Sequence, residues 1–207
     1  MPMKLSFDSA PSVRLAPVET PPRSVSSTRM RRLEPPDGPA QRAYLFPNDY
    51  TLVSYYVTQL LEPKADGLEP QDCEELGLAL RELLLNAIEH GNLGFGYAEK
   101  SRSLDAGDWK QRVTERQRQS EYADRQIEVC STWERDRVVI VIRDEGPGFD
   151  WRDLPDPTDP DNLLVAHGRG VLMARLSVDS LRYNDAGNEV TIVKLLTGIP
   201  ESQRVAG

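Results

Sequence analysis

The feature that most constrains the fold is a nearly unbroken run of valine and isoleucine over residues 137–143. β-branched residues favour strands, and an apolar run without alternation predicts a strand buried on both faces. Residues 126–132 alternate apolar and polar side chains, which predicts a second strand, and residues 134–136 predict a hairpin turn between the two. The pattern therefore predicts a sheet in which residues 137–143 form a central strand.

Helices and further strands are predicted on both sides of this hairpin. Apolar residues at helical spacing predict one helix over residues 49–61 and a stronger one from Pro70 to His90, which Gly91 and Asn92 stop. Further strands are predicted over residues 44–47, 178–183 and 189–196, and a short helix over residues 168–176.

A chain of 207 residues suits one globular domain with tails. Recurrent prolines, with Ser and Arg between them, predict a disordered arm over residues 1–42, because such a stretch neither sustains a helix nor buries a core. The domain is predicted over residues 43–197. It carries a polar, helical insertion over residues 93–125 and a loop rich in Pro and Asp over residues 150–167, and residues 198–207 are predicted to fray.

The composition narrows the classes of partner. The formal net charge is -8, whereas a protein that binds duplex nucleic acid normally needs a basic face, so no direct nucleic-acid contact is expected. No apolar run approaches the roughly 20 residues that cross a bilayer, and no signal peptide is recognisable, so a cytoplasmic protein without membrane contact is expected. Cys73 and Cys130 form no Cys-x-x-Cys pair, which favours buried reduced thiols over zinc ligands.

Glu82 and Asn86 form the first candidate segment. They are four residues apart on the predicted helix, so they lie on one face, about one turn from each other. Carboxylate and carboxamide oxygens are ligands that suit Mg²⁺. Taken alone, this segment is equally compatible with a solvated Glu and Asn at the border of a leucine stripe.

The second segment, Asp144-x-Gly146-x-Gly148-Phe149, directly follows the central strand. A carboxylate at a strand end accepts a hydrogen bond from an amino group such as N6 of adenine. Glycines let the backbone approach a planar ring, and Phe149 offers packing surface. A plain Asp-Gly turn stays open as the alternative for this segment.

The third segment is Gly168-x-Gly170, at the predicted start of a helix after the long loop. Free backbone N–H groups and the helix dipole favour phosphate at such a position. A lone Gly-x-Gly is also typical of a simple loop end.

In this order, the three segments resemble the N, G1 and G2 boxes of the GHKL (histidine kinase-like) ATPase family. The resemblance extends over residues 44–196 and is best to the branch of anti-sigma-factor serine kinases, including the run Gly187-Asn188-Glu189-Val190 before the last strand. It implies an α/β sandwich (α+β, the Bergerat-type ATP-binding fold). In that fold a mixed, mostly antiparallel sheet carries helices on one face, with ATP and Mg²⁺ between helices and sheet.

The resemblance also implies roles for individual residues. Glu82 would be the general base for a serine hydroxyl or a water, and Asn86 would hold Mg²⁺ against the phosphates. Asp144 would bind adenine N6, while Gly146 and Gly148 shape the adenine pocket.

Further implied roles concern the phosphates and the rim of the pocket. Residues 150–167 would form the ATP lid, and Gly168 and Gly170 would cradle the phosphates. Arg169 would either approach the γ-phosphate or form a surface salt bridge. Asn188 stands where many relatives carry a threonine near the adenine, and it can still form hydrogen bonds there.

His90 and His167 are the only histidines. Histidine kinases phosphorylate a histidine on a separate helix, but both histidines here fall within the nucleotide-box segments. Self-sufficient histidine-kinase activity is therefore excluded. His90 is predicted to be a helix-end packing residue at the cofactor site, and His167 a part of the lid hinge.

Two functions follow from the resemblance. The first is a protein serine kinase that sequesters a sigma factor and phosphorylates a serine on an antagonist protein. The second is a nucleotide-gated module that binds a partner without phosphoryl transfer. A third, weaker alternative is a subunit that docks to a phosphatase or receiver domain. The resemblance is also compatible with a homodimer, and the insertion over residues 93–125 would either cover the nucleotide or form a partner surface.

Overall fold

The computed structural model of the chain describes residues 31–33, 41–62, 68–153 and 169–197. At its centre lies a six-stranded sheet with the order β1-β2-β3-β4-β6-β5, in which each neighbouring pair is antiparallel. The strands are β1 (Arg31–Leu33), β2 (Gln41–Pro47), β3 (Gln126–Trp133), β4 (Arg137–Asp144), β5 (Ser180–Tyr183) and β6 (Glu189–Leu195).

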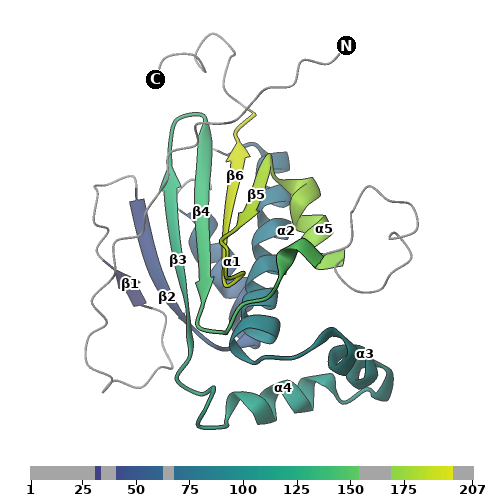
Figure 1. Ribbon diagram of the computed structural model, residues 1–207. Helices are drawn as coiled ribbons and strands as arrows, with labels where there is room; N and C mark the ends of the chain where they lie inside the picture. The colour runs from purple at the N-terminus through teal and green to yellow at the C-terminus, as the bar shows by residue number, and fades with distance from the viewer. Residues whose placement is uncertain (1–30, 34–40, 63–67, 154–168, 198–207) are drawn as a thin grey trace.

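Three helices cover one face of this sheet (Figure 1). They are α1 (Val53–Leu61), α2 (Pro70–Asn86) and α5 (Arg169–Ser177). A 3-10 turn, Tyr50–Leu52, leads into α1, and a π-helical turn, Ala87–Asn92, continues α2. Within the described part of the chain, no helix is both long and apolar enough to cross a membrane.

The hydrophobic core lies between the helices and the sheet. Ile127, Val129, Ser131 and Trp133 of β3 are buried, and the residues that alternate with them are only partly buried, as the alternating pattern predicts. The run of valine and isoleucine forms β4, which lies between β3 and β6. The predicted α/β sandwich with a central strand at residues 137–143 is thus confirmed, with described strand pairs that are antiparallel throughout.

The predicted insertion forms two helices, α3 (Tyr97–Ala106) and α4 (Trp109–Gln117), beyond one end of the sheet (Figure 1). The predicted break near residues 101–105 falls slightly later, at Gly107, which has a left-handed φ of 75° and ends α3. Trp109 and Val113 are buried and belong to the main core. The insertion is therefore packed onto the domain.

The structure changes two predicted boundaries, the extent of the N-terminal arm and the start of the strand predicted over residues 44–47. Residues 31–33 form β1, paired with β2, and β2 itself begins at Gln41, so a disordered arm over residues 1–42 is wrong for these positions. β1 forms because its backbone groups pair with the edge of β2, and the proline-rich sequence around residues 31–33 does not indicate this pairing. The rest of that arm, residues 154–167 of the lid and the tail over residues 198–207 lie outside the described residues. Of the predicted lid, Trp151–Asp153 forms a 3-10 turn.

Candidate functional site

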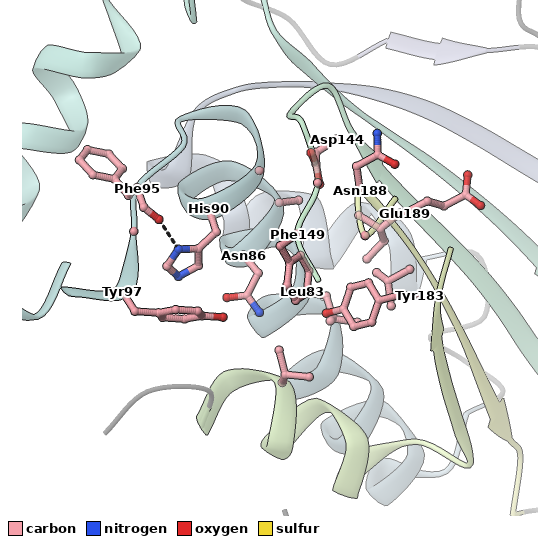
Figure 2. Close-up of a pocket in the computed structure, with 18 residues that line it drawn as sticks. Leu83, Asn86, His90, Phe95, Tyr97, Asp144, Phe149, Tyr183, Asn188 and Glu189 are labelled. Carbon is pink, nitrogen blue, oxygen red and sulfur yellow. Dashed lines mark hydrogen bonds between the residues drawn. The ribbon is translucent and has the colours of Figure 1, made fainter. Parts of the chain in front are cut away.

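A cavity of about 210 Å³ lies between the helical layer and the end of the sheet (Figure 2). Its walls come from α2 and its π-helical turn, the start of α3, the end of β4 with the glycine segment after it, α5, and the β5–β6 hairpin. The residues that line it are Leu83, Asn86, Ala87, His90, Gly91, Phe95, Gly96, Tyr97, Ile142, Asp144, Gly148, Phe149, Val171, Tyr183, Gly187, Asn188, Glu189 and Val190. The lining is mostly apolar with a few polar groups, as is usual for small-molecule sites.

Asp144 ends β4 and faces this cavity. One carboxylate oxygen accepts a hydrogen bond from the Gly146 amide at 2.8 Å. The carboxylate also packs against Gly91, where a Cβ would lie 2.3 Å from its carboxyl carbon, so only glycine fits. Burial raises the pKa of Asp144 to about 6, and the Gly146 hydrogen bond and Arg125 partly oppose this rise.

Asn92, which is fully buried, joins the π-helical turn to the sheet. Its amide nitrogen donates to the Gln126 carbonyl at 3.0 Å, and its amide oxygen accepts from the Glu145 backbone at 2.8 Å. Its own carbonyl accepts from the Arg125 guanidinium at 2.6 Å. Asn92 therefore fixes the backbone next to Asp144, and sequence reasoning, which took Asn92 as a helix stop, missed this role.

The glycine segment after β4 interlocks with the β5–β6 turn. Gly148 has a φ of 81°, and a Cβ there would lie 1.9 Å from the Ala186 carbonyl oxygen. Gly187 has a φ of 80°, and a Cβ there would lie 2.0 Å from the Phe149 carbonyl oxygen. The Phe149 amide also donates to Ala186 at 3.1 Å. The two turns approach so closely that both need glycine.

Asn188 closes this side of the cavity. Its backbone carbonyl accepts a hydrogen bond from the Asp144 amide at 3.0 Å, and its side-chain oxygen accepts one from Asn184 at 2.9 Å.

Glu82 and Asn86 meet the first turn of α5. A Cβ on Gly170 would lie 2.5 Å from the Glu82 Oε2 atom and 3.8 Å from the Asn86 amide nitrogen. Asn86 lines the cavity, whereas Glu82, one helical turn earlier, is not among the lining residues. The helical spacing that placed these two side chains on one face is therefore confirmed.

His90 is a neutral donor at the wall of the cavity. Its Nδ1 atom lies 2.6 Å from the Phe95 carbonyl oxygen, which only accepts hydrogen bonds, so Nδ1 carries the proton. Burial is the main cause that lowers the pKa of His90, which keeps the ring uncharged at neutral pH. The ring also packs against Tyr97, with centroids 4.4 Å apart.

The structure brings most predicted site residues together. Those that line the cavity are Asn86, His90, Asp144, Gly148, Phe149 and Asn188. Gly146 is buried against the Gly91 carbonyl, where a Cβ would lie 2.2 Å from the oxygen. Gly168 and the Arg169 side chain lie outside the described residues, so their predicted contact with phosphate stays a prediction.

Sequence reasoning missed several lining residues. Gly91 was taken only as a helix stop, although a glycine between two nucleotide boxes signals a close backbone approach. Gly187 entered only as part of the run before the last strand, without a role of its own, and Tyr183 lies in a predicted strand that carries no motif. Tyr97 belongs to the insertion, where no local motif marks it.

A family model for the histidine kinase-like ATPase domain matches residues 47–194. The chain belongs to this family. No curated protein matches it. The match supports an ATP-binding, kinase-like ATPase domain, and it covers every described residue of the cavity.

The cavity fits the adenine nucleotide that a histidine kinase-like ATPase domain takes. Ile142 and Val190 offer apolar surface for a base, and Asp144 offers a buried acceptor for its amino group. Asn86 offers an amide oxygen that suits Mg²⁺. Among the described residues, no group of three or more His, Cys, Asp or Glu side chains can hold a metal alone. A magnesium ion there would take its other ligands from phosphates and water.

Proposed function

We propose that this ATPase domain is a protein serine kinase that switches a protein partner. The observation that carries the proposal is the position of Glu82, whose carboxylate lies against Gly170 at the start of α5 and next to Asn86. A helix N-terminus favours phosphate. A carboxylate there, which no described cation pairs with in a salt bridge, suits a general base beside the transferred group.

Bound ATP would supply the phosphoryl group, and Mg²⁺ would neutralise its charge. Asn86 holds the metal, and Asp144 accepts the hydrogen bond of the adenine amino group. Glu82 accepts the proton of a serine hydroxyl while that oxygen bonds to the γ-phosphorus and the bond to ADP breaks. The remaining rate enhancement comes from positioning and charge neutralisation.

The partner follows from the resemblance to anti-sigma-factor serine kinases. A sigma factor would be sequestered by the chain, and the serine would lie on an antagonist protein that competes for it. A homodimer is part of the same proposal, since the resemblance is compatible with one, and so is the cytoplasmic location that the sequence predicts. The chain would differ from its relatives in the surfaces formed by the insertion over residues 93–125 and by the arm over residues 1–42.

A second function, a nucleotide-gated binding module without transfer, is favoured by one observation. Glu82 is not among the residues that line the cavity, although its carboxylate lies against Gly170. In such a module ATP would change partner affinity, and hydrolysis would be slow.

Glu82→Gln separates the two functions. Purified protein is incubated with Mg²⁺, γ-labelled ATP and an extract of its own cells, and phosphoserine sites are mapped. The kinase proposal expects wild-type labelling of a specific serine and a loss of about 10²–10⁴-fold in Glu82→Gln, with ATP affinity retained. Glu74→Gln, an exposed position on the same helix, serves as the matched control. Equal labelling by both variants, or none by wild type, contradicts the kinase proposal.

A further inference from the structure

The insertion contributes a wall to the cavity. Phe95, Gly96 and Tyr97 all line it, and Tyr97 is the first residue of α3. Figure 2 shows Tyr97 on the side of His90, with its hydroxyl directed toward Asn86, while Asp144 lies at the other side of the cavity. The side chain therefore reaches the end of the site where Asn86 would hold Mg²⁺ and phosphates.

Tyr97 is held there by contacts within and beneath the insertion. Phe95 packs edge-on against Trp109 at 4.7 Å, and the Arg116 guanidinium lies 3.7 Å from the centre of the Phe95 ring. Arg116 also pairs with Glu99 at 2.8 Å. The backbone that carries Tyr97 is thus fixed by aromatic and cation–π contacts on both sides.

A buried ion pair ties the same helix to the N-box turn. Glu89 of the π-helical turn is 4% exposed and pairs with Lys100 of α3, one helical turn after Tyr97. A buried carboxylate of this kind requires its partner, because an unpaired charge there would be strongly destabilising. The position of α3 relative to Asn86 is therefore fixed from two sides.

The chemistry of this wall suits a phosphate-bearing ligand. Tyr183 of β5 also lines the cavity, and its hydroxyl, like that of Tyr97, is directed toward the Asn86 side, so the two phenols approach that side from different elements (Figure 2). Phenol hydroxyls donate to phosphate oxygens without carrying charge. Hydrogen bonds to charged acceptors are about twice as strong as neutral ones.

We propose that Tyr97 is a nucleotide-binding residue that the insertion supplies, with its hydroxyl donating to a phosphate oxygen of the nucleotide at the Asn86 end. This inference rests on the ATP site of the proposed function but not on phosphoryl transfer. It gives the insertion a role that the N, G1 and G2 boxes do not contain: α3 and α4 complete the phosphate end of the pocket.

The test measures binding of adenosine, ADP and ATP, each with Mg²⁺, by calorimetry on the full chain. Tyr97→Phe keeps the ring on His90 and removes only the hydroxyl. We expect ADP or ATP to bind about 10-fold more weakly, with adenosine changed less than about twofold, since only the phosphates lose a charged hydrogen bond. Tyr55→Phe, an exposed tyrosine on α1, is the matched control and should change none of the three affinities.

Other outcomes overturn the inference in distinguishable ways. Unchanged ADP and ATP affinities in Tyr97→Phe, with normal wild-type binding, refute the role of Tyr97 and leave the ATP site standing. If adenosine affinity falls as much as ADP and ATP affinity, Tyr97 contacts the nucleoside rather than the phosphates, and its assignment is refuted. Wild-type protein that binds no adenine nucleotide overturns both this inference and the proposed function. Thermal unfolding of each variant confirms that the fold is retained.

Discussion

The two ends of the cavity are built by different means. At the Asp144 end, backbone packs on backbone: Gly148 meets Ala186, and Gly187 meets Phe149. At the Asn86 end, side chains from three helices converge, and Gly170 meets side-chain atoms of Glu82 and Asn86 rather than backbone. The Asp144 end therefore has little room to adjust without a shift of the backbone, whereas the Asn86 end can adjust by side-chain rotation. A glycine-to-alanine substitution should therefore mainly lower stability at the Asp144 end and mainly lower activity at the Asn86 end.

Gly148→Ala should give the largest effect. The added methyl would lie 1.9 Å from a backbone oxygen at a φ of 81°, so the two turns must separate. We expect the free energy of unfolding to fall by about 3 kcal/mol or more, measured by urea denaturation.

Gly107→Ala is the matched control for this rigid end. Gly107 has a similar φ of 75°, but a Cβ there meets nothing within 4 Å. It should lose only about 1 kcal/mol, the cost of the left-handed backbone conformation. Equal losses in the two variants would show that the interlocked turns do not constrain the fold.

Asp144→Asn should separate stability from binding at the same end. Because the folded-state pKa of Asp144 is raised to about 6, from an ordinary value of 3.8, the folded protein binds the proton more tightly than the unfolded chain. The stability of the wild type therefore falls as pH rises from about 4 to about 6 and stays lower above that. At pH 7 the variant should be more stable than wild type by about 2 kcal/mol, and the pH-dependent loss should shrink.

Adenosine binding gives the functional side of this prediction. Adenosine is the suitable ligand because phosphate groups themselves titrate near pH 6. Wild-type affinity should rise as pH increases through about 6, where Asp144 becomes an ionised acceptor, and the variant should bind weakly at all pH values. A wild-type affinity that is flat between pH 5 and pH 8 would exclude Asp144 as the group that binds the base.

Gly170→Ala should give the smallest change in stability and a clear change in activity. The added methyl conflicts with the Glu82 carboxylate, which can rotate away, and alanine favours the helix. We expect a change of less than about 1 kcal/mol in the free energy of unfolding and a marked loss of serine phosphorylation. Normal phosphorylation in this variant would show that the position of Glu82 does not matter.

Residues that follow a strong local rule could be predicted from the sequence. The run at residues 137–143 predicted a central strand, and the spacing of Glu82 and Asn86 predicted a shared face; both hold in the structure. The position of Asp144 at a strand end is confirmed for the same reason, since the apolar run stops there.

Features that depend on distant contacts could not be predicted. β1 forms because it pairs with the edge of β2. The sequence in and around β1 is rich in Arg and Pro and does not by itself predict a strand. Asn92 acts through partners more than 30 residues away in the chain. Tyr97 reaches the cavity only because Phe95, Trp109 and Arg116 pack as they do. No short segment of the sequence contains all the residues whose contacts place β1, Asn92 and Tyr97.

The interlock between the glycine segment and the last hairpin has a consequence during synthesis. The backbone next to Asp144 is completed by Ala186 and Asn188, about 40 residues further along the chain. A nascent chain that has emerged only as far as β4 contains Asp144 but lacks the β5–β6 turn, whose residues Ala186 and Asn188 bond to the backbone around it. The cavity is therefore incomplete until residue 188 has left the ribosome, and a ligand of this cavity would not stabilise a shorter nascent chain.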